Sequence, residues 1–554
     1  ESCLALVDGF LDHQVDGGLG LLQAQTGSLG GGPCGHLCGL PPALDRSDVY
    51  DNALAAIYYV KRGRLEEARR ILDVFTSLLY PGDLRPSSTF PGQRGGIQFP
   101  GTVYHGLPSG RPLTLLAAAY RSTMKARAGQ YWGVEVMDGA VDTGNNAWAA
   151  LAFAHYAAAA GAKSRPEARC YAAVARDVLA ALANASVCGD SLGGYLGRLP
   201  PFPANYRSTE HNLDVAALAR ALGDAAVSAH AERFVRQMHA RRPDYPRAYA
   251  TGTGKSSPGE RCGSSVPASA PVAADAQFWT LLAGADPGGW RAADAVWWAL
   301  QRPEGPEGSR EATQGMWESD ADVVGAGNDS VAAPRLNGTR FTNWGTGVQW
   351  EVTASATIAM VKSGQQLGGE ADPRLARRID EARNSLYHLL VRYGGVPASV
   401  LGGNYEAWRR NLHHSAYPGG SDTGIGWSYF RYLHVASTAW TGLLLLYQAD
   451  AASPVLEDGT PTRWACRPTR CPTAAPTCPA CPRRHGARPE GPPRRAARAV
   501  PRSVRGPRAP LASPTRSTDS LRTATRCLGR RRRGRPATRA RPRTSLRDKR
   551  GPAS

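Results

Sequence analysis

Apolar residues recur at helical spacing along most of the first 450 residues, and the helices that they predict follow one another in pairs. The first helix of each pair is apolar on nearly all sides, which indicates burial all round, whereas the second keeps a charged face toward solvent. A sixth buried helix over 436–446 has no following partner, and an amphipathic helix over 3–14 could take that place and close a ring. The predicted pairs are 48–60 with 64–75, 144–153 with 165–183, 210–222 with 225–240, 275–282 with 290–300, and 350–360 with 374–391.

Polar residues stand at the start of each predicted buried helix, in larger numbers than helix capping needs. The stretch Arg207–Leu222 is the richest, because Glu210, His211, Asn212 and Asp214 crowd its beginning. The inner helices of a closed barrel all point the same way, so these starts would meet at one end, together with the positive ends of the helix dipoles. Long connections, typical of functional loops around one face, are predicted at 80–112, 242–268 and 301–345.

Five motifs at these helix starts resemble the six-hairpin glycosidase-like superfamily, and the resemblance covers roughly residues 40–450. They are Tyr50-Asp-Asn-Ala-Leu-Ala-Ala, Asn145-Asn-Ala-Trp-Ala-Ala-Leu, Ser208-Thr-Glu-His-Asn-Leu-Asp, Asp275-Ala-Gln-Phe-Trp and Trp350-Glu-Val-Thr-Ala. The resemblance implies an all-α fold, the (α/α)6 barrel or six-hairpin toroid, with long loops on one face. It also implies an enzyme that cleaves or rearranges glycosidic bonds. It points to no single family, so it transfers no catalytic residue.

Cleavage of a glycosidic bond needs two carboxyl groups, one protonated and one ionised. Glu210, Asp214 and Glu351 are the predicted catalytic residues, because they lie in or near the first turns of buried helices, where burial raises a carboxyl pKa and a helix N-terminus lowers it. Polar and aromatic residues near the same end form the predicted substrate-binding set: Asp51, Asn145, Asn146, His211, Asn212, Asp275, Trp344, Trp350, Asp422, Trp427 and Tyr429.

Structural roles compete with several of these assignments. Asp51 and Asp275 could simply cap their helices, and Asp142, a further candidate, could be a turn residue before Gly144. Trp148, Trp279 and Trp440 follow helical spacing, which favours the core over a sugar-binding surface.

No metal or cofactor is predicted. His211 has no second histidine at ligand spacing nearby. The segment 251–257 superficially resembles a phosphate-binding loop, but Tyr249 stands where that motif requires its leading glycine.

The charge of the chain is concentrated at its C-terminal end. Residues 451–554 hold 26 of the 66 Lys and Arg residues and 5 of the 46 Asp and Glu residues, so they carry +21 and the rest carries −1. We therefore predict a barrel domain over 1–455 and a disordered Arg/Pro-rich tail over 456–554. The abrupt change of composition favours a translation or gene-model artefact over a nucleic-acid-binding arm, and the folded domain is expected to bind no nucleic acid.

The compartment is suggested only indirectly. Sequons at Asn184, Asn328 and Asn337 would suit a secreted or lumenal protein, and the even number of cysteines before the tail permits disulfides. The chain begins at Glu1, so a signal peptide could be missing. No apolar run reaches the ~18 residues of a membrane span, and we expect a monomer.

The leading hypothesis is a glycoside hydrolase that acts on an oligo- or polysaccharide. A polysaccharide lyase or sugar epimerase on the same scaffold would instead use a His or Tyr base, so His211, Asn212 and Tyr429 would matter more. A lyase would also need basic residues for uronic acids, for which Arg207 and Arg340 are the candidates. A third hypothesis is a non-catalytic glycan-binding or scaffold protein on a decayed barrel.

Overall fold

A computed structural model describes most of the chain before residue 452. The chain divides into two units, Glu1–Cys471 and Pro472–Ser554, and the predicted tail over 456–554 lies outside the described residues. The described residues are 3–16, 19–24, 46–80, 101–122, 134–162, 164–165, 167–254, 259–268, 270–303, 315–322, 334–362, 364, 372–401, 421–426, 428–429 and 431–451.

Helices account for most of the described residues, and every helix that the apolar pattern predicts is present with ends shifted by a few residues, except that α4 continues nine residues further. No helix in the described ranges is long and apolar enough to cross a membrane. The helices are α1 (Cys3–His13), α2 (Val49–Lys61), α3 (Leu65–Leu79), α4 (Thr143–Ala162), α5 (Glu167–Ser186), α6 (Thr209–Ala221), α7 (Ala225–Met238), α8 (Ala274–Ala283), α9 (Trp290–Ala299), α10 (Trp350–Lys362), α11 (Pro373–Tyr393) and α13 (Val435–Ala451).

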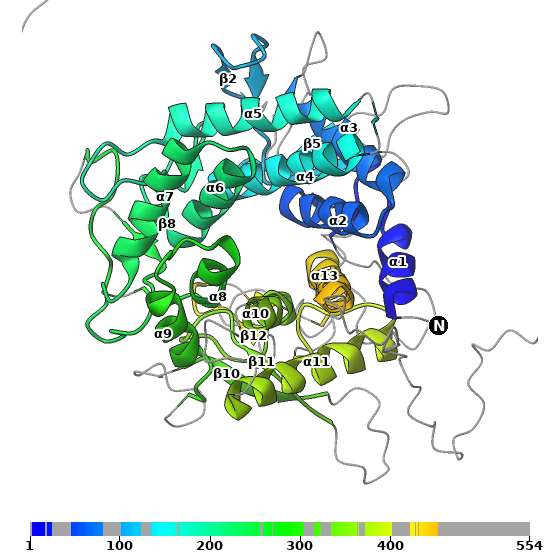
Figure 1. Cartoon of the computed structure of the whole chain (residues 1–554), viewed down its shortest axis with the longest axis vertical. Coiled ribbons are helices and arrows are strands. Elements are labelled where there is room, and N and C mark those ends of the chain that lie inside the picture. Colours follow the sequence, from blue (N-terminus) through cyan, green and yellow to red (C-terminus); the bar gives the residue numbers. More distant parts are fainter. Residues whose placement is uncertain are drawn as a thin grey trace, which may run out of the picture. The chain divides into compact units, whose positions relative to one another are not determined.

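Six of these helices form a closed inner ring. In order around the ring, α2 contacts α4, α4 contacts α6, α6 contacts α8, α8 contacts α10, α10 contacts α13, and α13 returns to α2 (Figure 1). Small residues such as Ala53, Ala56, Ala147 and Ala150 are fully buried on these helices and let the backbones approach closely. This closed ring supports the predicted barrel.

The remaining helices form an outer layer, and each packs on its predicted inner partner. The helices α3, α5, α7, α9 and α11 contact α2, α4, α6, α8 and α10 respectively. The amphipathic helix α1 contacts α13 and α11, so the first helix of the chain pairs with the last inner helix. The prediction that the helix near the N-terminus fills the sixth outer place is confirmed.

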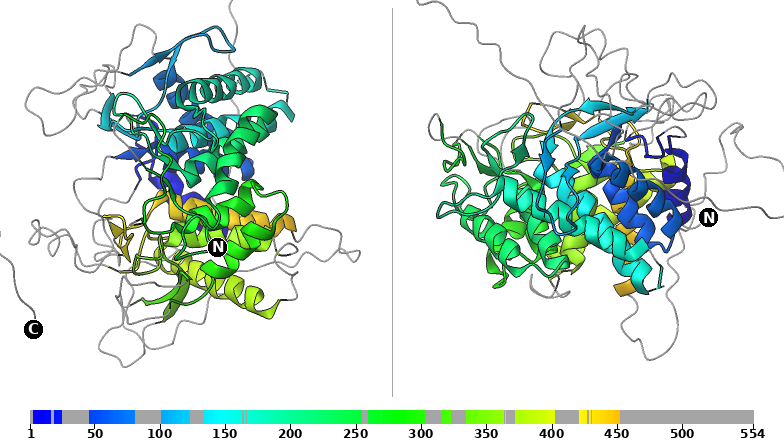
Figure 2. Two further views of the ribbon diagram at one scale, coloured as in Figure 1. Left: turned by 90° about the vertical axis from the view of Figure 1, so that its left-hand side faces the viewer. Right: turned by 90° about the horizontal axis from the view of Figure 1, so that it is seen from above.

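Short strands, which the sequence analysis did not predict, occur in the connections and just before several inner helices. They form small antiparallel ribbons and one three-stranded sheet in the order β1-β4-β5, and two side views show them mainly on one side of the helices (Figure 2). The strands are β1 (Ser47–Asp48), β2 (Val103–Tyr104), β3 (Leu113–Thr114), β4 (Ala119–Ser122), β5 (Val134–Asp138), β6 (Val141–Asp142), β7 (Arg198–Leu199), β8 (Arg207–Ser208), β9 (Gly252–Thr253), β10 (Trp317–Ala321), β11 (Arg335–Thr339), β12 (Ser421–Asp422) and β13 (Ser428–Tyr429).

The fourth residue of each inner helix fastens that helix to a loop beside it. The amide of Asn146 accepts a hydrogen bond from the backbone N–H of Leu116 at 2.8 Å and donates to the carbonyls of Leu116 and Asp142 at 3.0 Å each. Asn52 and Gln277 bind a loop residue in the same two-way manner, to Leu22 and Tyr249. Thr353 and Thr438 use a hydroxyl, which accepts the backbone N–H of Thr339 and of Val396 respectively.

Asn212 completes this set. Like Asn146, it was predicted to bind substrate, but the structure places it against a loop. Its amide accepts from the Tyr195 N–H at 2.8 Å and donates to the carbonyls of Tyr195 and Ser208. Asn146 and Asn212 are both fully buried, and neither lines the pocket described below. Their amides hold loops rather than sugar hydroxyls, because backbone groups already occupy their donors and acceptors.

Candidate active site

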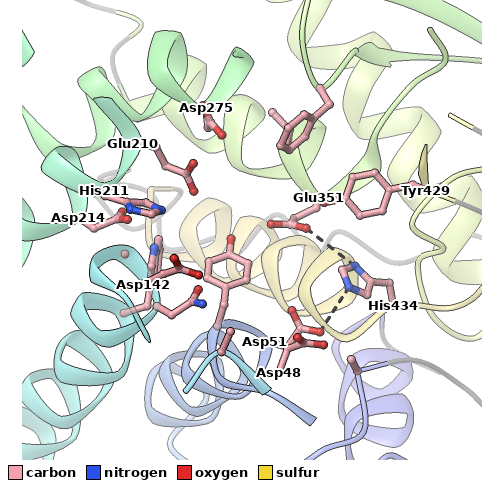
Figure 3. A pocket seen from close by; sticks show the side chains of 18 of the residues that line it. Asp48, Asp51, Asp142, Glu210, His211, Asp214, Asp275, Glu351, Tyr429 and His434 are labelled. Carbon is pink, nitrogen blue, oxygen red and sulfur yellow. Dashed lines mark ion pairs between the residues drawn. The ribbon is translucent and has the colours of Figure 1, made fainter. Parts of the chain in front are cut away.

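A pocket of about 650 Å³ opens where the inner helices begin. Nine of its 24 lining residues are second or third residues of these helices, so they stand two places or one place before a loop-holding residue. These residues are Tyr50 and Asp51 of α2, Gly144 and Asn145 of α4, Glu210 and His211 of α6, Asp275 of α8, and Glu351 and Val352 of α10. The predicted meeting of polar helix starts is therefore found, and Figure 3 shows the side chains converging there.

One group of carboxyls in the pocket consists of Glu210, Asp214 and Asp275. Glu210 and Asp275 share a hydrogen bond, and Asp214 lies one turn further along α6 with its Oδ2 atom unpartnered among the described residues. Burial raises the pKa of Glu210 well above its usual range, and the negative charges of Asp275 and Asp214 raise it further. Burial likewise raises the pKa of Asp214 well above its usual range and that of Asp275 to about 6. Among the described residues no basic side chain is paired with this group, so burial and the mutual repulsion of the carboxylates favour its protonated forms.

A second group lies across the pocket and contains a histidine. The Nε2 atom of His434 is 3.4 Å from Asp51 Oδ2, and its Nδ1 atom is 3.9 Å from Glu351 Oε2 (Figure 3). Burial disfavours the His434 cation, but Asp51 and Glu351 outweigh that effect and raise its pKa. Burial raises the pKa of Glu351 to about 7, although the nearby His434 and a hydrogen bond from Tyr50 act in the opposite direction.

His211 lies beside the first group and is held by backbone and packing. Its Nδ1 atom lies 3.0 Å from the carbonyl oxygen of Gly197, and burial lowers its pKa. Gly144 permits this packing, because a Cβ atom there would come within 2.5 Å of His211 Cδ2 and 2.9 Å of Asp214 Oδ2. We therefore treat His211 as a neutral imidazole facing the pocket.

Two ion pairs occupy another part of the lining. Arg46 binds Asp48 at 2.6 Å, and Arg198 binds Asp142 at 2.7 Å. Among the described residues, these two arginines are the only lysine or arginine residues in the lining, and each is paired with its own carboxylate. Because seven carboxyl groups line the same pocket, its balance of charge is acidic.

Aromatic side chains form an apolar part of the lining. Trp148 contacts Tyr50, Trp279 and Trp440 edge-on, with ring centroids 5.4, 5.6 and 5.6 Å apart. Trp440 is buried and donates its indole N–H to the Tyr50 hydroxyl at 2.9 Å, as the predicted core role requires. Trp148 and Trp279 were also expected in the core, but both line the pocket.

Tyr429 and Asn145 are the other predicted binding residues that the structure brings to the pocket. Tyr429 comes from β13 and lies with its ring centroid 6.0 Å from that of Phe341, another lining residue. Burial raises the pKa of Tyr429 well above its usual range, and the charge of Glu351 adds to this effect.

Other predicted binding residues do not line the pocket. Trp344 donates its indole N–H to the Tyr245 hydroxyl at 3.0 Å, and Trp350 is fully buried as the first residue of α10. The carboxylate of Asp422 accepts the N–H of Gly424 at 2.9 Å within a turn. Each of these side chains is used to hold a loop or fill the core, and Trp427 lies outside the described residues.

The sequence analysis missed several pocket residues, above all His434. This residue directly precedes α13, the same place that Asp48 and Ser208 occupy before α2 and α6. Aligning the six helix starts on their fourth residues would have found it. Tyr432, Tyr206 and Arg46 come from connections between helices, where no periodic pattern marks a lining residue.

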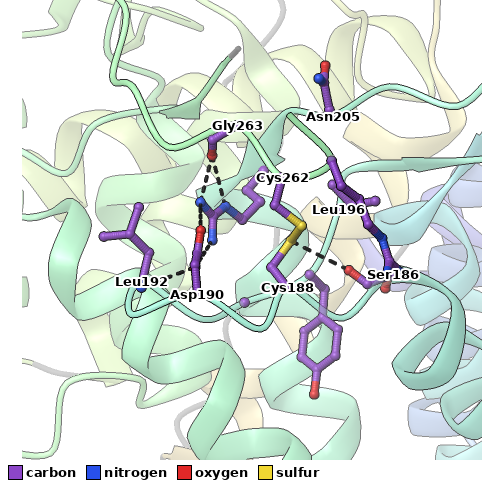
Figure 4. The surroundings of a disulfide bond; sticks show 12 residues. Ser186, Cys188, Asp190, Leu192, Leu196, Asn205, Cys262 and Gly263 are labelled. Atoms are coloured by element: carbon purple, nitrogen blue, oxygen red, sulfur yellow. Dashed lines mark hydrogen bonds and ion pairs between the residues drawn. A yellow bond between two sulfur atoms is a disulfide. The ribbon is translucent and has the colours of Figure 1, made fainter. Parts of the chain in front are cut away.

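Arg207, proposed as a uronic-acid ligand, is instead a fully buried structural residue. Its guanidinium donates to Asp190 at 2.7 and 2.9 Å and to the carbonyls of Gly193 and Gly263 at 2.7 and 2.6 Å. The disulfide Cys188–Cys262 joins the same two loops (Figure 4). The cluster fixes the backbone directly before α6. Arg340, the other candidate, pairs with Glu318 at 2.6 Å and does not line the pocket.

Metal ligands are not grouped in the part of the chain that the structure describes, where no three His, Cys, Asp or Glu side chains are placed to hold an ion.

Comparison with known proteins gives only distant similarity. No family model and no curated protein matches the sequence. The chain is similar to the solved structure of a family 76 glycoside hydrolase from a bovine Bacteroides thetaiotaomicron strain, with a TM-score of 0.42 and 11% identity, over 81% of this chain and 77% of that one. It is also similar to cellobiose 2-epimerase from Spirochaeta thermophila DSM 6192, with a TM-score of 0.42 and 14% identity over 81% and 96%.

A third similar structure is a D-mannose isomerase, with a TM-score of 0.42 and 9% identity over 81% of this chain and 96% of that one. At such identities and TM-scores the similarity assigns no activity to this chain.

Proposed function

We propose that the chain is an (α/α)6-barrel carbohydrate-active enzyme, a glycoside hydrolase in which Glu210 is the general acid and Glu351 the base or nucleophile. The observation that carries this proposal is the contrast between the surroundings of these two carboxyls. Burial and the negative charges of Asp275 and Asp214 raise the pKa of Glu210 and favour its protonated form. Glu351 has His434 and the Tyr50 hydroxyl beside it, which favour its ionised form.

This contrast suits both halves of glycoside hydrolysis. The protonated Glu210 gives its proton to the glycosidic oxygen as the bond to the anomeric carbon breaks. The ionised Glu351 either takes a proton from the attacking water or attacks the anomeric carbon itself. Asp275 lies beside Glu210, and its negative charge raises the pKa of Glu210 and so favours the protonated acid.

The lining of the pocket favours an uncharged sugar. An acidic substrate would place its charge among seven carboxyl groups, with no lysine and no unpaired arginine in the lining to receive it. Trp148 and Trp279 offer apolar surface for a sugar ring. A lyase acting on uronic acids is therefore the less favoured alternative.

The test is to assay the full chain, Glu210→Gln and Glu351→Gln on a panel of neutral oligo- and polysaccharides. We expect new reducing ends with the unaltered chain and a loss of about 100-fold or more in kcat with each variant. Asp372→Asn, far from the pocket at the start of α11, should keep full activity. Full activity in both Gln variants would refute the assigned roles, and the absence of any product or binding would refute the function.

A sugar epimerase or isomerase is the second candidate, because His211 and His434 both line the pocket, from α6 and from just before α13. Two histidines can remove and return a proton next to a carbonyl. In deuterated water, such an enzyme would incorporate deuterium on carbon, which NMR of the product would detect, and would release no new reducing ends.

A further inference from the structure

A second hollow, of about 530 Å³, lies on the outer layer of helices and shares no lining residue with the acidic pocket. Of the residues that the structure describes, five arginines line it and no carboxyl residue does. Arg302 follows the end of α9, Arg374, Arg377 and Arg378 lie in the first two turns of α11, and Arg247 comes from the connection between α7 and α8. The hollow thus has the opposite charge to the pocket.

The carboxylates near this hollow do not neutralise it. Asp294 binds Arg247 at 2.5 Å, Asp372 binds Arg374 at 2.8 Å, and Glu381 binds both Arg377 and Arg378 at 2.8 Å. Three carboxylates thus face five guanidinium groups, and Arg302 has no ion-pair partner within the described ranges. The side chains of Arg374 and Arg377 remain 77% and 72% exposed, so they can turn toward a ligand.

Indole rings accompany these charges. Trp297 lines the hollow, with the Arg374 guanidinium 4.8 Å from its ring centroid. Trp290 lies seven residues earlier on α9, which places it on the same face about 10 Å away. It is 58% exposed, and the Arg291 guanidinium lies 4.4 Å from its ring. Each ring therefore offers a flat apolar surface beside a cation.

We propose that the arginine hollow, together with Trp290 and Trp297, is a second binding site that takes an acidic glycan. Sulfate, phosphate and carboxylate groups match the planar donor pattern of arginine, and the indole faces suit the apolar faces of sugar rings. This proposal does not depend on the reaction in the acidic pocket.

The test is arginine footprinting of the full chain with phenylglyoxal, read by peptide mass spectrometry. The probes are a sulfated oligosaccharide, an oligogalacturonate, a neutral oligosaccharide and inorganic sulfate, at equal ionic strength. We expect the two acidic oligosaccharides to protect Arg302, Arg374 and Arg377 by about threefold or more, because guanidinium groups bound to anions react poorly. The neutral probe and inorganic sulfate should give no comparable protection.

Arg69 is the matched internal control, because it forms an exposed i,i+4 ion pair with Asp73 on the outer helix α3, as Arg377 does with Glu381 on α11. Protection of the run Arg530–Arg533 is a second control, because it measures non-specific electrostatic attraction of the acidic probes. Equal protection at Arg69 and at this run, or equal protection by inorganic sulfate, would overturn the site. Protection by only one of the two acidic oligosaccharides would identify its acidic group.

Two variants distinguish the contribution of the arginine charges to glycan binding from that of the indole rings. Replacing both Arg302 and Arg377 with Ala should weaken acidic-glycan binding by about tenfold and abolish protection at Arg374, with the melting temperature unchanged. Trp290→Ala should also reduce the protection, because stacking on the ring is lost. Undiminished protection in Trp290→Ala would reject a glycan in favour of a simple anion, whereas Arg69→Ala should change nothing.

Discussion

At the scale of single residues, His434 sets the protonation state of Glu351. His434→Asn would remove the cation that lowers the pKa of Glu351, so this pKa should rise from about 7. Because the base must be ionised, we expect the acidic limb of the kcat/KM profile to move to higher pH by about one unit. Ser437→Ala, which removes only a hydrogen bond to His434, should leave the limb in place. An unmoved limb in His434→Asn would show that Glu351 is not the base.

Asp214 gives a second prediction, on stability. Its raised pKa in the folded chain means that the unfolded state loses this proton first, so the group makes the fold less stable as pH rises above about 4. Asp214→Asn removes this pH-dependent decrease in the free energy of unfolding, because asparagine carries no titratable proton. Relative to the unaltered chain, the variant should therefore gain about 1 kcal/mol or more in free energy of unfolding between pH 5 and pH 8.

Urea unfolding at pH 5 and pH 8 measures this difference. The control is Asp372→Asn, since the pKa of Asp372 is lowered to about 2 and the residue is ionised in both states across that range. Its effect on stability should be the same at both pH values. If Asp214→Asn also behaved in this way, the carboxyl of Asp214 would have to be ionised in the folded chain.

At the scale of elements, the sequence predicted the helices well and the loops poorly. Helices that bury one or all faces leave a 3.6-residue pattern, so α1 to α11 and α13 could be located within a few residues, apart from the C-terminal end of α4. The ribbons β10–β11 and β12–β13 depend on pairing between distant or irregular segments, which leaves no such pattern. Pocket residues on helices, such as Glu210 and Asp275, were found, whereas Tyr432 and Arg46 in connections were not.

The fourth-residue rule also explains which polar residues were misassigned. Sequence shows that Asn145 and Asn146 both follow the start of α4, but not which one faces the pocket. Successive helical residues differ by about 100° in direction, so one of the two faces the loop and the other the pocket. Asn146 and Asn212 occupy the loop-facing fourth place, and neither lines the pocket.

Gly144 tests how closely α4 and α6 must approach. In Gly144→Ala, the added Cβ would overlap His211 Cδ2 and Asp214 Oδ2, so these side chains or the helices must shift. We expect a loss of about 1–3 kcal/mol in free energy of unfolding and a fall in kcat. Gly9→Ala on the outer helix α1 is the control, because no atom lies within 4 Å of its new Cβ, and alanine there should add about 0.5–1 kcal/mol. Equal effects of the two changes would contradict the close packing at Gly144.

At the scale of the whole molecule, the two ends of the described chain close one ring. Val7 and Leu11 of α1 are fully buried, and α1 packs on α13. Asp8 and Asp12 accept hydrogen bonds from the hydroxyls of Tyr58 and Tyr59 on α2 at 2.8 and 3.0 Å. The first helix therefore joins the last inner helix to the first, which sequence periodicity alone could suggest but not establish.

Shortening the chain at either end should consequently have opposite results. We propose that residues 1–455 form the domain, so a chain ending at 455 should keep its activity and its unfolding midpoint. It should elute much earlier from a cation exchanger, because residues 451–554 carry +21 and the rest −1.

Removing residues 1–13 from that shortened chain would expose the apolar faces of α13 and α11 and leave the hydroxyls of Tyr58 and Tyr59 without their partners. We expect the midpoint of urea unfolding to fall sharply, by more than the loss of one buried side chain, about 2–5 kcal/mol, would cause. A harmless loss of 1–13 would contradict the structural role of α1, and unfolding on loss of 456–554 would contradict the proposed domain boundary.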